Sequence, residues 1–497
     1  MRLRPLLVVL ALALPMLPGA AEAKRPASCG TVVRGIDLDR ATVLDLQAAM
    51  RARRLTSVDL VQAYLARIRT YDHGPGALNS IRTLSPTALK QAASLDKERR
   101  RGHVRGPLHG IPVLLKDNVG TSDMPTTAGS IALAGSVPRN DAGLVKRLRA
   151  AGAIILGKTN LSEFANWVDL SMPNGYSSLG GQVVNPYTEG DPSGSSSGSG
   201  VAAAMTFAAV TIGTETSGSI LSPSEANSVV GLKPTWGLVP GDGIIPLAPS
   251  FDVAGPMVRS TADAAAVMDV IAKPGFVKAL DRNALKGVRL GVPSDGGGAL
   301  FAAALAKLRA LGATLVETDV VPNAGLASIS ELGLIPNEFK ASLNAYLGTT
   351  ARPVTGVKTL HDIVEYNKAH PDKVKYGQQL LEVSDASPGL TPLAEASAIP
   401  VREQARAVIT AALAKDDLDA IVAPGASNAN VGAAAGYPSV VVPIGYAGDT
   451  DPTGLMLTGP AGSDARLLAY AYAYEQATRL RRPPVAMNPD LRPSSCR

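Results

Sequence analysis

Apolar residues recur at helical spacing through the first part of the chain. Residues 43–71 predict two amphipathic helices, the second of which is capped by Thr56 or Ser57, and residues 86–100 predict a third. The run 111–115 is instead continuously apolar and leads into three polar residues, which is the pattern of a buried strand. This part of the chain therefore combines surface helices with at least one strand that is covered on both faces.

The rest of the chain continues this alternation of helices with short apolar strands, as in repeated βαβ units. Predicted helices lie at 141–151, from Val201 onward, and at 262–272, 301–310, 401–414 and 464–479. Predicted strands lie at 153–156, 208–213, 288–292, 314–317, 419–423 and 438–443. Residues 320–400 have weaker periodicity and several prolines, and they predict a helical insertion. No linker divides the chain cleanly.

Composition places the protein among large globular proteins. Of its 497 residues, 46% are hydrophobic and 18% are charged, a mixture that can bury an extensive core. The 49 glycines and 37 prolines are not periodic, which excludes collagen and implies many turns. Aromatic residues make up only 4%, which argues against a base-stacking platform. The net charge of +6 is spread out, so no nucleic-acid partner is expected.

Residues 1–23 have the pattern of a signal peptide. Arg2 and Arg4 give a positive start, residues 6–17 are apolar, and small residues flank a cleavage site after Ala23. The apolar run is too short to span a bilayer about 30 Å thick, and no other apolar segment of about 20 residues follows. We therefore predict a secreted or periplasmic protein that has no membrane association after cleavage.

Export changes the interpretation of the two cysteines, Cys29 and Cys496. In an oxidising compartment they can form a disulfide that ties the two ends of the mature chain together, and the alternative is two unpaired thiols. The five histidines lack the spacing of metal ligands. The sequence thus predicts neither a metal site nor a cofactor.

Three short motifs match known patterns but lie in the wrong context. Residues 152–159 fit the phosphate-binding loop GxxxxGK[ST], yet the four variable residues are apolar and indicate a strand. Residues 194–198 fit the GxSxG elbow of a Ser-His-Asp hydrolase, but a turn precedes them where a strand is required. Residues 94–97 fit SxxK on a charged helix, with no KTG motif following. None of the three predicts the corresponding chemistry.

Three other segments are better candidates for a reaction site. In residues 106–118 (GPLHGIPVLLKDN) an apolar strand carries a lysine at its buried end. Residues 190–200 (GDPSGSSSGSG) are too closely followed by a predicted helix to form a flexible linker. Residues 213–219 (GTETSGS) follow a strand and form a tight, glycine-containing turn.

With these motifs the sequence resembles the amidase signature family of serine amidohydrolases. The motifs GPLHGIPVLLKDN, GSSSGS and GTETSGSI occur in the family's order and are followed by VVGLKPTWGLV (229–239), FDVAGPM (251–257) and GYPSVVVPIG (436–445). The resemblance covers nearly the whole mature chain. It implies an α/β fold: one large domain over 24–497, with a mixed central sheet and helices on both faces.

The resemblance also implies a Ser-Ser-Lys triad. By position, Ser219 is the nucleophile, Ser195 is the bridging serine after a cis peptide bond, and Lys116 is the general base. A lysine serves as a base only when it is neutral, so burial has to lower its pKa from about 10.4. The backbone amides of Thr216, Ser217, Gly218 and Ser219 would stabilise the oxyanion.

The sequence departs from the family pattern at four positions. Ser193 and Ser197 replace glycines, Ser217 replaces a glycine of the oxyanion turn, and Leu221 stands where many members have arginine. The missing arginine weakens the case for an anionic substrate. None of the departures removes a residue of the implied triad.

Further likeness, in GDGIIPL (241–247) and NEFKASLNAYL (337–347), indicates the peptide-amidase branch, whose members remove ammonia from C-terminal amides of peptides. By analogy, loops near 167–176 and the 320–400 insertion would determine specificity. The alternatives are an aryl-acylamidase, a carbamate or ester hydrolase, an amidotransferase subunit and a non-catalytic binding protein. Export argues against the amidotransferase, and an intact triad argues against the binding protein.

Overall fold

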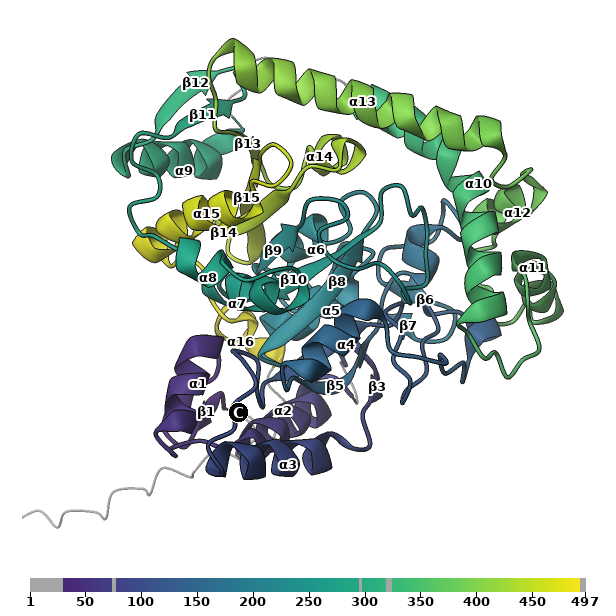
Figure 1. Ribbon diagram of the computed structural model, residues 1–497, viewed down its shortest axis with the longest axis horizontal. Coiled ribbons are helices and arrows are strands. Elements are labelled where there is room, and N and C mark those ends of the chain that lie inside the picture. The colour runs from purple at the N-terminus through teal and green to yellow at the C-terminus, as the bar shows by residue number, and fades with distance from the viewer. Residues whose placement is uncertain (1–29, 74–76, 295–296, 319–323, 492–497) are drawn as a thin grey trace, which may run out of the picture.

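The computed structural model (Figure 1) describes residues 30–73, 77–294, 297–318 and 324–491, with the backbone alone for 324–332, 392–400 and 489. The signal peptide over 1–23 and both Cys29 and Cys496 lie outside the described residues. Cleavage after Ala23 and the disulfide therefore stay predictions.

The fold is organised around an eleven-stranded sheet with the order β12-β11-β13-β15-β14-β9-β10-β8-β4-β5-β3. Strand β4 pairs in parallel with β5 and β8, and β11 pairs in parallel with β12 and β13, whereas the other neighbours are antiparallel. The predicted mixed central sheet is thus confirmed. Its strands are β3 (Ile81–Leu84), β4 (Pro112–Lys116), β5 (Ile154–Thr159), β8 (Val210–Glu215), β9 (Val230–Lys233), β10 (Val253–Val258), β11 (Arg289–Val292), β12 (Thr314–Glu317), β13 (Ala420–Pro424), β14 (Ser439–Ala447) and β15 (Asp451–Thr458).

Helices cover both faces of this sheet. Every residue of β4, β5, β8 and β10 is buried, which is possible only where both faces are covered. The helices of the main body are α1 (Val43–Arg51), α2 (Ser57–Tyr71), α3 (Ala88–Arg100), α4 (Gly143–Ala150), α5 (Ser197–Ala204), α6 (Leu221–Ala226), α7 (Thr261–Ile271), α8 (Phe276–Ala279), α9 (Gly298–Ala310), α14 (Ala429–Ala435), α15 (Asp464–Thr478) and α16 (Pro484–Met487). Two small hairpins pair β1 (Val32–Val33) with β2 (Ile36–Asp37) and β6 (Tyr176–Ser177) with β7 (Gly181–Gln182). Short 3-10 helices lie at η1 (Ile131–Leu133), η2 (Glu163–Asn166) and η3 (Pro489–Leu491).

The predicted insertion is helical and forms the arm seen at the right and along the top of Figure 1. It contains α10 (Ala324–Thr349), α11 (Leu360–Ala369), α12 (Gln379–Ala386) and α13 (Pro392–Lys415). Helix α13 runs through residue 400 as one helix and includes the helix predicted at 401–414. Buried apolar residues of the insertion share a second core with residues 128–133, 164–168 and 245–251 of the main body.

Most predicted elements are present, but four strands of the central sheet were not predicted, among them β3, which like β9 has only four residues. Strand β9 is only four residues long, β10 contains Gly255 and Pro256, and β15 begins with Asp451 and Pro452. These residue types usually indicate turns, so local pattern alone hides strands that neighbouring strands hold in place. Helix α5 also begins four residues before Val201, in a Ser/Gly segment of low helix propensity.

The resemblance to a phosphate-binding loop has a structural explanation. Residues 154–159 form β5, and Lys158 is fully buried. Its Nζ donates to the Val119 carbonyl and to Thr126 Oγ1, both at 2.6 Å, and lies 4.0 Å from Asp117 Oδ1. This lysine is therefore committed to protein contacts.

Within the described ranges, no helix combines the length and apolar character needed to cross a bilayer.

Helix α5 packs so closely on the sheet that it requires glycine at position 198. A Cβ atom there would lie 2.4 Å from the Asn160 carbonyl oxygen and 2.5 Å from that of Ser80. Gly198→Ala should lower the free energy of unfolding by about 1–3 kcal/mol, because backbone atoms have to move. Gly348→Ala on α10 is the matched control, since nothing lies within 4 Å of its Cβ position. Urea unfolding of both variants measures the difference, and equal effects would contradict this packing.

Candidate active site

Lys116 is the last residue of β4, a central strand whose five residues are all buried. Its Nζ donates hydrogen bonds to Ser195 Oγ at 2.8 Å and to the Thr214 carbonyl at 3.2 Å. The side chain has no exposed surface. The apolar run that predicts the strand thus delivers an amine into the interior, where water cannot solvate it.

Ser195 lies in the tight loop that precedes α5. The Gly194–Ser195 peptide bond is cis, as the family resemblance implied. Gly194 is closely surrounded, because a Cβ there would meet Ser162 Oγ at 2.6 Å and Asn174 Oδ1 at 2.8 Å. The loop is anchored from both sides: Ser162 N donates to the Ser195 carbonyl at 3.1 Å, and Ser196 Oγ donates to the Thr214 carbonyl at 2.9 Å. Ser195 is consequently held against Lys116.

Ser219 lies in the turn that joins β8 to α6. The Ser196 amide donates to the Ser219 carbonyl at 3.2 Å, which brings the two serine loops together. Ser219 is 8% exposed, and its hydroxyl has no hydrogen-bond partner among the described residues. The structure therefore contains the Lys116–Ser195 contact but not a Ser195–Ser219 hydrogen bond. Catalytic hydrogen bonds are often longer in ligand-free enzymes than in complexes.

The turn before Ser219 leaves backbone amides without acceptors. Gly218 has a φ of +80°, in the left-handed region that favours glycine. The amides of Thr216, Ser217 and Ser219 have no acceptor in the described part of the chain. The Gly218 amide instead stabilises the charged form of Glu215. Among the described residues, none of the four amides predicted to bind the oxyanion thus has a hydrogen-bond acceptor, although that of Gly218 lies close enough to Glu215 to lower the pKa of its carboxyl group.

Burial determines the charge state of Lys116. It lowers the pKa of this amine to about 7, although the negative charges of Asp252 and Glu215 oppose the shift. A lysine with such a pKa is substantially neutral near neutral pH and can accept a proton.

Two carboxylates at the site were not among the predicted residues. Glu215 ends β8 and accepts from the amides of Ile220 at 2.7 Å and Leu221 at 3.1 Å, so it closes the turn that carries Ser219. Burial raises the pKa of Glu215, while the buried Lys233 ammonium opposes that rise. The positive charge of Lys233 therefore partly compensates the negative charge of Glu215 in the interior.

Asp252 connects the same turn to a second loop. It accepts from Thr216 Oγ1 at 2.6 Å and from the amides of Leu247 at 2.8 Å and Ala248 at 3.0 Å. Glu215 and Asp252 both lie inside motifs that carry the resemblance. Their roles follow only from the three-dimensional structure, because nothing in the sequence pairs Glu215 with Ile220 or Asp252 with Thr216.

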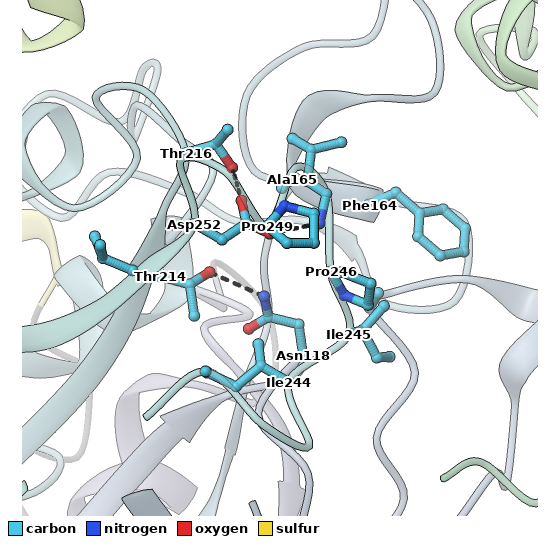
Figure 2. A pocket seen from close by; sticks show the side chains of 14 residues that line it. Asn118, Phe164, Ala165, Thr214, Thr216, Ile244, Ile245, Pro246, Pro249 and Asp252 are labelled. Atoms are coloured by element: carbon cyan, nitrogen blue, oxygen red, sulfur yellow. Dashed lines mark hydrogen bonds between the residues drawn. The ribbon is translucent and has the colours of Figure 1, made fainter. Parts of the chain in front are cut away.

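A pocket with a volume of about 140 Å³ opens beside these groups (Figure 2). Thr214 and Asp252 lie on one side, and Phe164 and Ile245 lie on the opposite side. The lining is mainly apolar and is contributed by Asn118, Ala128, Phe164, Ala165, Thr214, Thr216, Gly241, Ile244, Ile245, Pro246, Leu247, Pro249, Asp252 and Val253. An apolar group can thus be accommodated next to the loop of Ser219.

The structure shows the surroundings of three of the four residues that depart from the family pattern. Leu221 is fully buried in an apolar cluster with Ala423, Val441 and Met456, so it does not face a ligand. Ser193 adopts a φ of +58°, a conformation that glycine adopts more readily. Ser197 Oγ donates to the Ser193 carbonyl at 2.5 Å.

The alternative chemistries find no matching geometry in the described residues. In the insertion, His361 Nδ1 lies 2.8 Å from Asp385 Oδ2. Among the described residues, no histidine side chain forms a hydrogen bond with a serine. The same residues contain no group of three or more His, Cys, Asp or Glu side chains that could hold a metal ion. What the site does contain is a buried amine, two serines and unoccupied backbone amides. That set is suited to acyl transfer through a serine ester.

Comparison with known proteins is consistent with this chemistry. A family model described as Amidase matches residues 59–434. A probable amidase of Arabidopsis thaliana is 38% identical over 508 residues, which covers 96% of this chain and 97% of that protein. The crystal structure of native peptide amidase from Stenotrophomonas maltophilia is 45% identical and has a TM-score of 0.85, over 90% of this chain and 98% of that one. A peptide amidase in complex with the competitive inhibitor chymostatin is 44% identical with the same TM-score, over 90% of this chain and 99% of that one.

The ionisation of Lys116 can be observed directly. In the ¹³C spectrum of lysine-labelled protein, the Lys116 Cε signal should titrate with a pKa of about 7. Asp252→Asn removes a negative charge that favours the ammonium form, so it should lower this pKa further. Lys116→Met identifies the signal among those of Lys158 and Lys233, whose pKa values burial lowers to about 8. A Lys116 pKa at the ordinary value of 10.5 would contradict the desolvated site.

Proposed function

The chain belongs to the amidase family and is an amide-hydrolysing enzyme, and from this premise we propose that it removes the terminal carboxamide of peptides through an acyl-enzyme on Ser219. The observation that carries the proposal is the 2.8 Å contact between Lys116 Nζ and Ser195 Oγ in a fully buried setting. In this scheme Ser219 is the nucleophile, Ser195 is the relay and Lys116 is the base.

The acylation step starts with neutral Lys116. Ser219 Oγ attacks the carbonyl carbon of the substrate and passes its proton to Ser195 Oγ, while the Ser195 proton moves to Lys116 Nζ. The carbonyl oxygen becomes an oxyanion, and in this proposal the amides of Thr216, Ser217 and Ser219 donate to it. Removing one such donor typically lowers the rate by about 10²–10³-fold.

Collapse of the tetrahedral intermediate breaks the C–N bond. The proton returns from Lys116 through Ser195 to the leaving nitrogen, which departs as ammonia and leaves an ester on Ser219. Water then attacks the ester and gives up a proton along the same path to Lys116. As the second tetrahedral intermediate collapses, that proton returns through Ser195 to Ser219 Oγ, so the carboxylic acid is released and both the serine hydroxyl and the neutral lysine are restored. No atom outside the chain, the substrate and water is required.

A peptide amide is the substrate class that the likeness and the pocket jointly support. The chain is 45% identical to a peptide amidase over 90% of its length. The pocket beside the Ser219 loop has a mainly apolar lining, which suits the side chain of the residue that bears the carboxamide. In our proposal the enzyme works outside the cytoplasm after removal of residues 1–23, with Cys29 and Cys496 joined as a disulfide.

The test is ammonia release from a panel of peptide C-terminal amides. Wild-type enzyme should release ammonia, whereas Ser219→Ala and Lys116→Met should each lower kcat by at least about 10⁴-fold. Ser195→Ala should be impaired by a similar order, because the relay is lost. Ser217→Ala retains its backbone amide and serves as the matched control.

Two results would count against parts of this account. Undiminished hydrolysis by Ser219→Ala would exclude it as nucleophile. No release from any peptide amide, with turnover of aryl amides, carbamates or esters that still depends on Ser219, would retain the triad and replace the substrate class.

A further inference from the structure

We propose that helix α10 of the insertion determines which substrate residue the pocket accepts, with Glu338 and Phe339 as positioning residues for two of its walls. The inference rests on the proposed function and adds a specificity device to it. Neither residue touches the triad. Each acts through a wall residue that does line the pocket.

The first wall is the loop 245–253, and Glu338 holds it from behind. The Glu338 side chain is buried, with 4% of the residue exposed, and its Oε2 accepts from the Ser250 amide at 2.9 Å. Ser250 lies between Pro249 and Asp252, which both line the pocket. A buried carboxylate that accepts a backbone amide is a strong, directional constraint, because the amide has no alternative acceptor once water is excluded.

Other hydrogen bonds hold the same loop at Leu247, Ala248 and Pro249, whereas the Ser250 amide is held by Glu338. Asp252 accepts from the amides of Leu247 and Ala248 at the inner side. Trp236 Nε1 donates to the Pro249 carbonyl at 3.0 Å at the outer side. The connection from the insertion to the loop amides therefore runs through Glu338.

The second wall is Phe164 with Ala165, and Phe339 holds it. The rings of Phe164 and Phe339 pack edge to face, with centroids 5.6 Å apart and an interplanar angle of 72°. Phe339 is fully buried. Phe164 and Ala165 have φ values of +44° and +59°, which L residues rarely adopt, so this wall needs outside support to keep its shape.

Both walls and α10 belong to one apolar cluster. Phe164, Ile245 and Leu247 of the pocket pack in the same core as Phe339 and Leu343 of α10. Adjacent residues of one helix thus contact both walls. Interiors pack densely and transmit displacement, so a change at α10 alters the width of the pocket.

This arrangement implies a preference for peptide amides whose last residue is apolar and of limited size. The catalytic groups lie on the central sheet, whereas the two supports lie on the insertion. Substitution at Glu338 or Phe339 should therefore change substrate choice much more than the chemistry at Ser219.

The experiment compares dipeptide amides that end in Ala-, Leu-, Phe- and Trp-amide. Phe339→Ala leaves space behind Phe164, and the ratio of kcat/KM for Trp-amide to kcat/KM for Ala-amide should rise about 10-fold relative to wild type. The loss of the support at Ser250 in Glu338→Ala should raise KM for Leu- and Phe-amide about 10-fold with a smaller change in kcat. Glu338→Gln keeps an acceptor for the Ser250 amide and should restore KM to within about 3-fold of wild type.

Matched controls separate specificity from stability. Phe301 on α9 is as deeply buried as Phe339, and Glu475 on α15 accepts from the Thr261 amide as Glu338 does from that of Ser250. Phe301→Ala and Glu475→Ala should lower thermal stability without changing the ratio between substrates. Because the ratio is independent of the fraction of folded enzyme, it remains informative for a destabilised variant. If Phe339→Ala does not fold, Phe339→Leu replaces it, with a shift of about 3-fold expected.

The outcomes distinguish this inference from the proposed function. Unchanged substrate ratios in Phe339→Ala and Glu338→Ala, with peptide amides still hydrolysed, would overturn the role of α10 alone. Ratios that shift equally in Phe301→Ala would also overturn it. If wild-type enzyme hydrolysed none of the four peptide amides, the proposed substrate class would fail, and the same variants compared on aryl amides of increasing size would still test the pocket walls.

Discussion

The structure depends above all on removing Lys116 from water. An exposed lysine is protonated at neutral pH and cannot accept a proton, whereas full burial lowers the pKa of this amine to about 7. That requires a strand end beneath two covering loops, which β4 and the segments around Ser195 and Ser219 provide. The 2.8 Å contact from Lys116 Nζ to Ser195 Oγ links the buried amine to the reaction site.

Burying a charge-bearing group is costly, and the surrounding fold limits that cost. Asp252 and Glu215 favour the ammonium form and so keep the pKa of Lys116 from falling further. Both carboxylates also have structural roles, since Glu215 closes the Ser219 turn and Asp252 links Thr216 to the pocket loop. The parallel pairing of β4 with β8 brings these groups together at one edge of the sheet. The insertion adds the walls that shape the ligand space.

The sequence predicted most of the central architecture because its apolar runs and amphipathic helices have clear periods. The helical insertion and the strand in place of a phosphate loop agree with those patterns, whereas the mixed sheet was implied by the family resemblance. Strands β10 and β15 escaped prediction because Gly, Pro and Asp residues disguise them. Motifs located Lys116, Ser195 and Ser219, but not Asp252 or the Glu338–Ser250 contact. Such long-range pairs depend on tertiary packing, which residue spacing does not record.

The pH dependence of the first turnover tests the central claim most directly. Ammonia release in the pre-steady state reports acylation, which in the proposed mechanism requires neutral Lys116. The rate should rise with a single ionisation near pH 7 to a plateau at higher pH, because the neutral fraction of Lys116 rises across that range. A midpoint near the ordinary lysine value of 10.5, or a flat profile that Lys116→Met leaves unchanged, would contradict a desolvated lysine as the base.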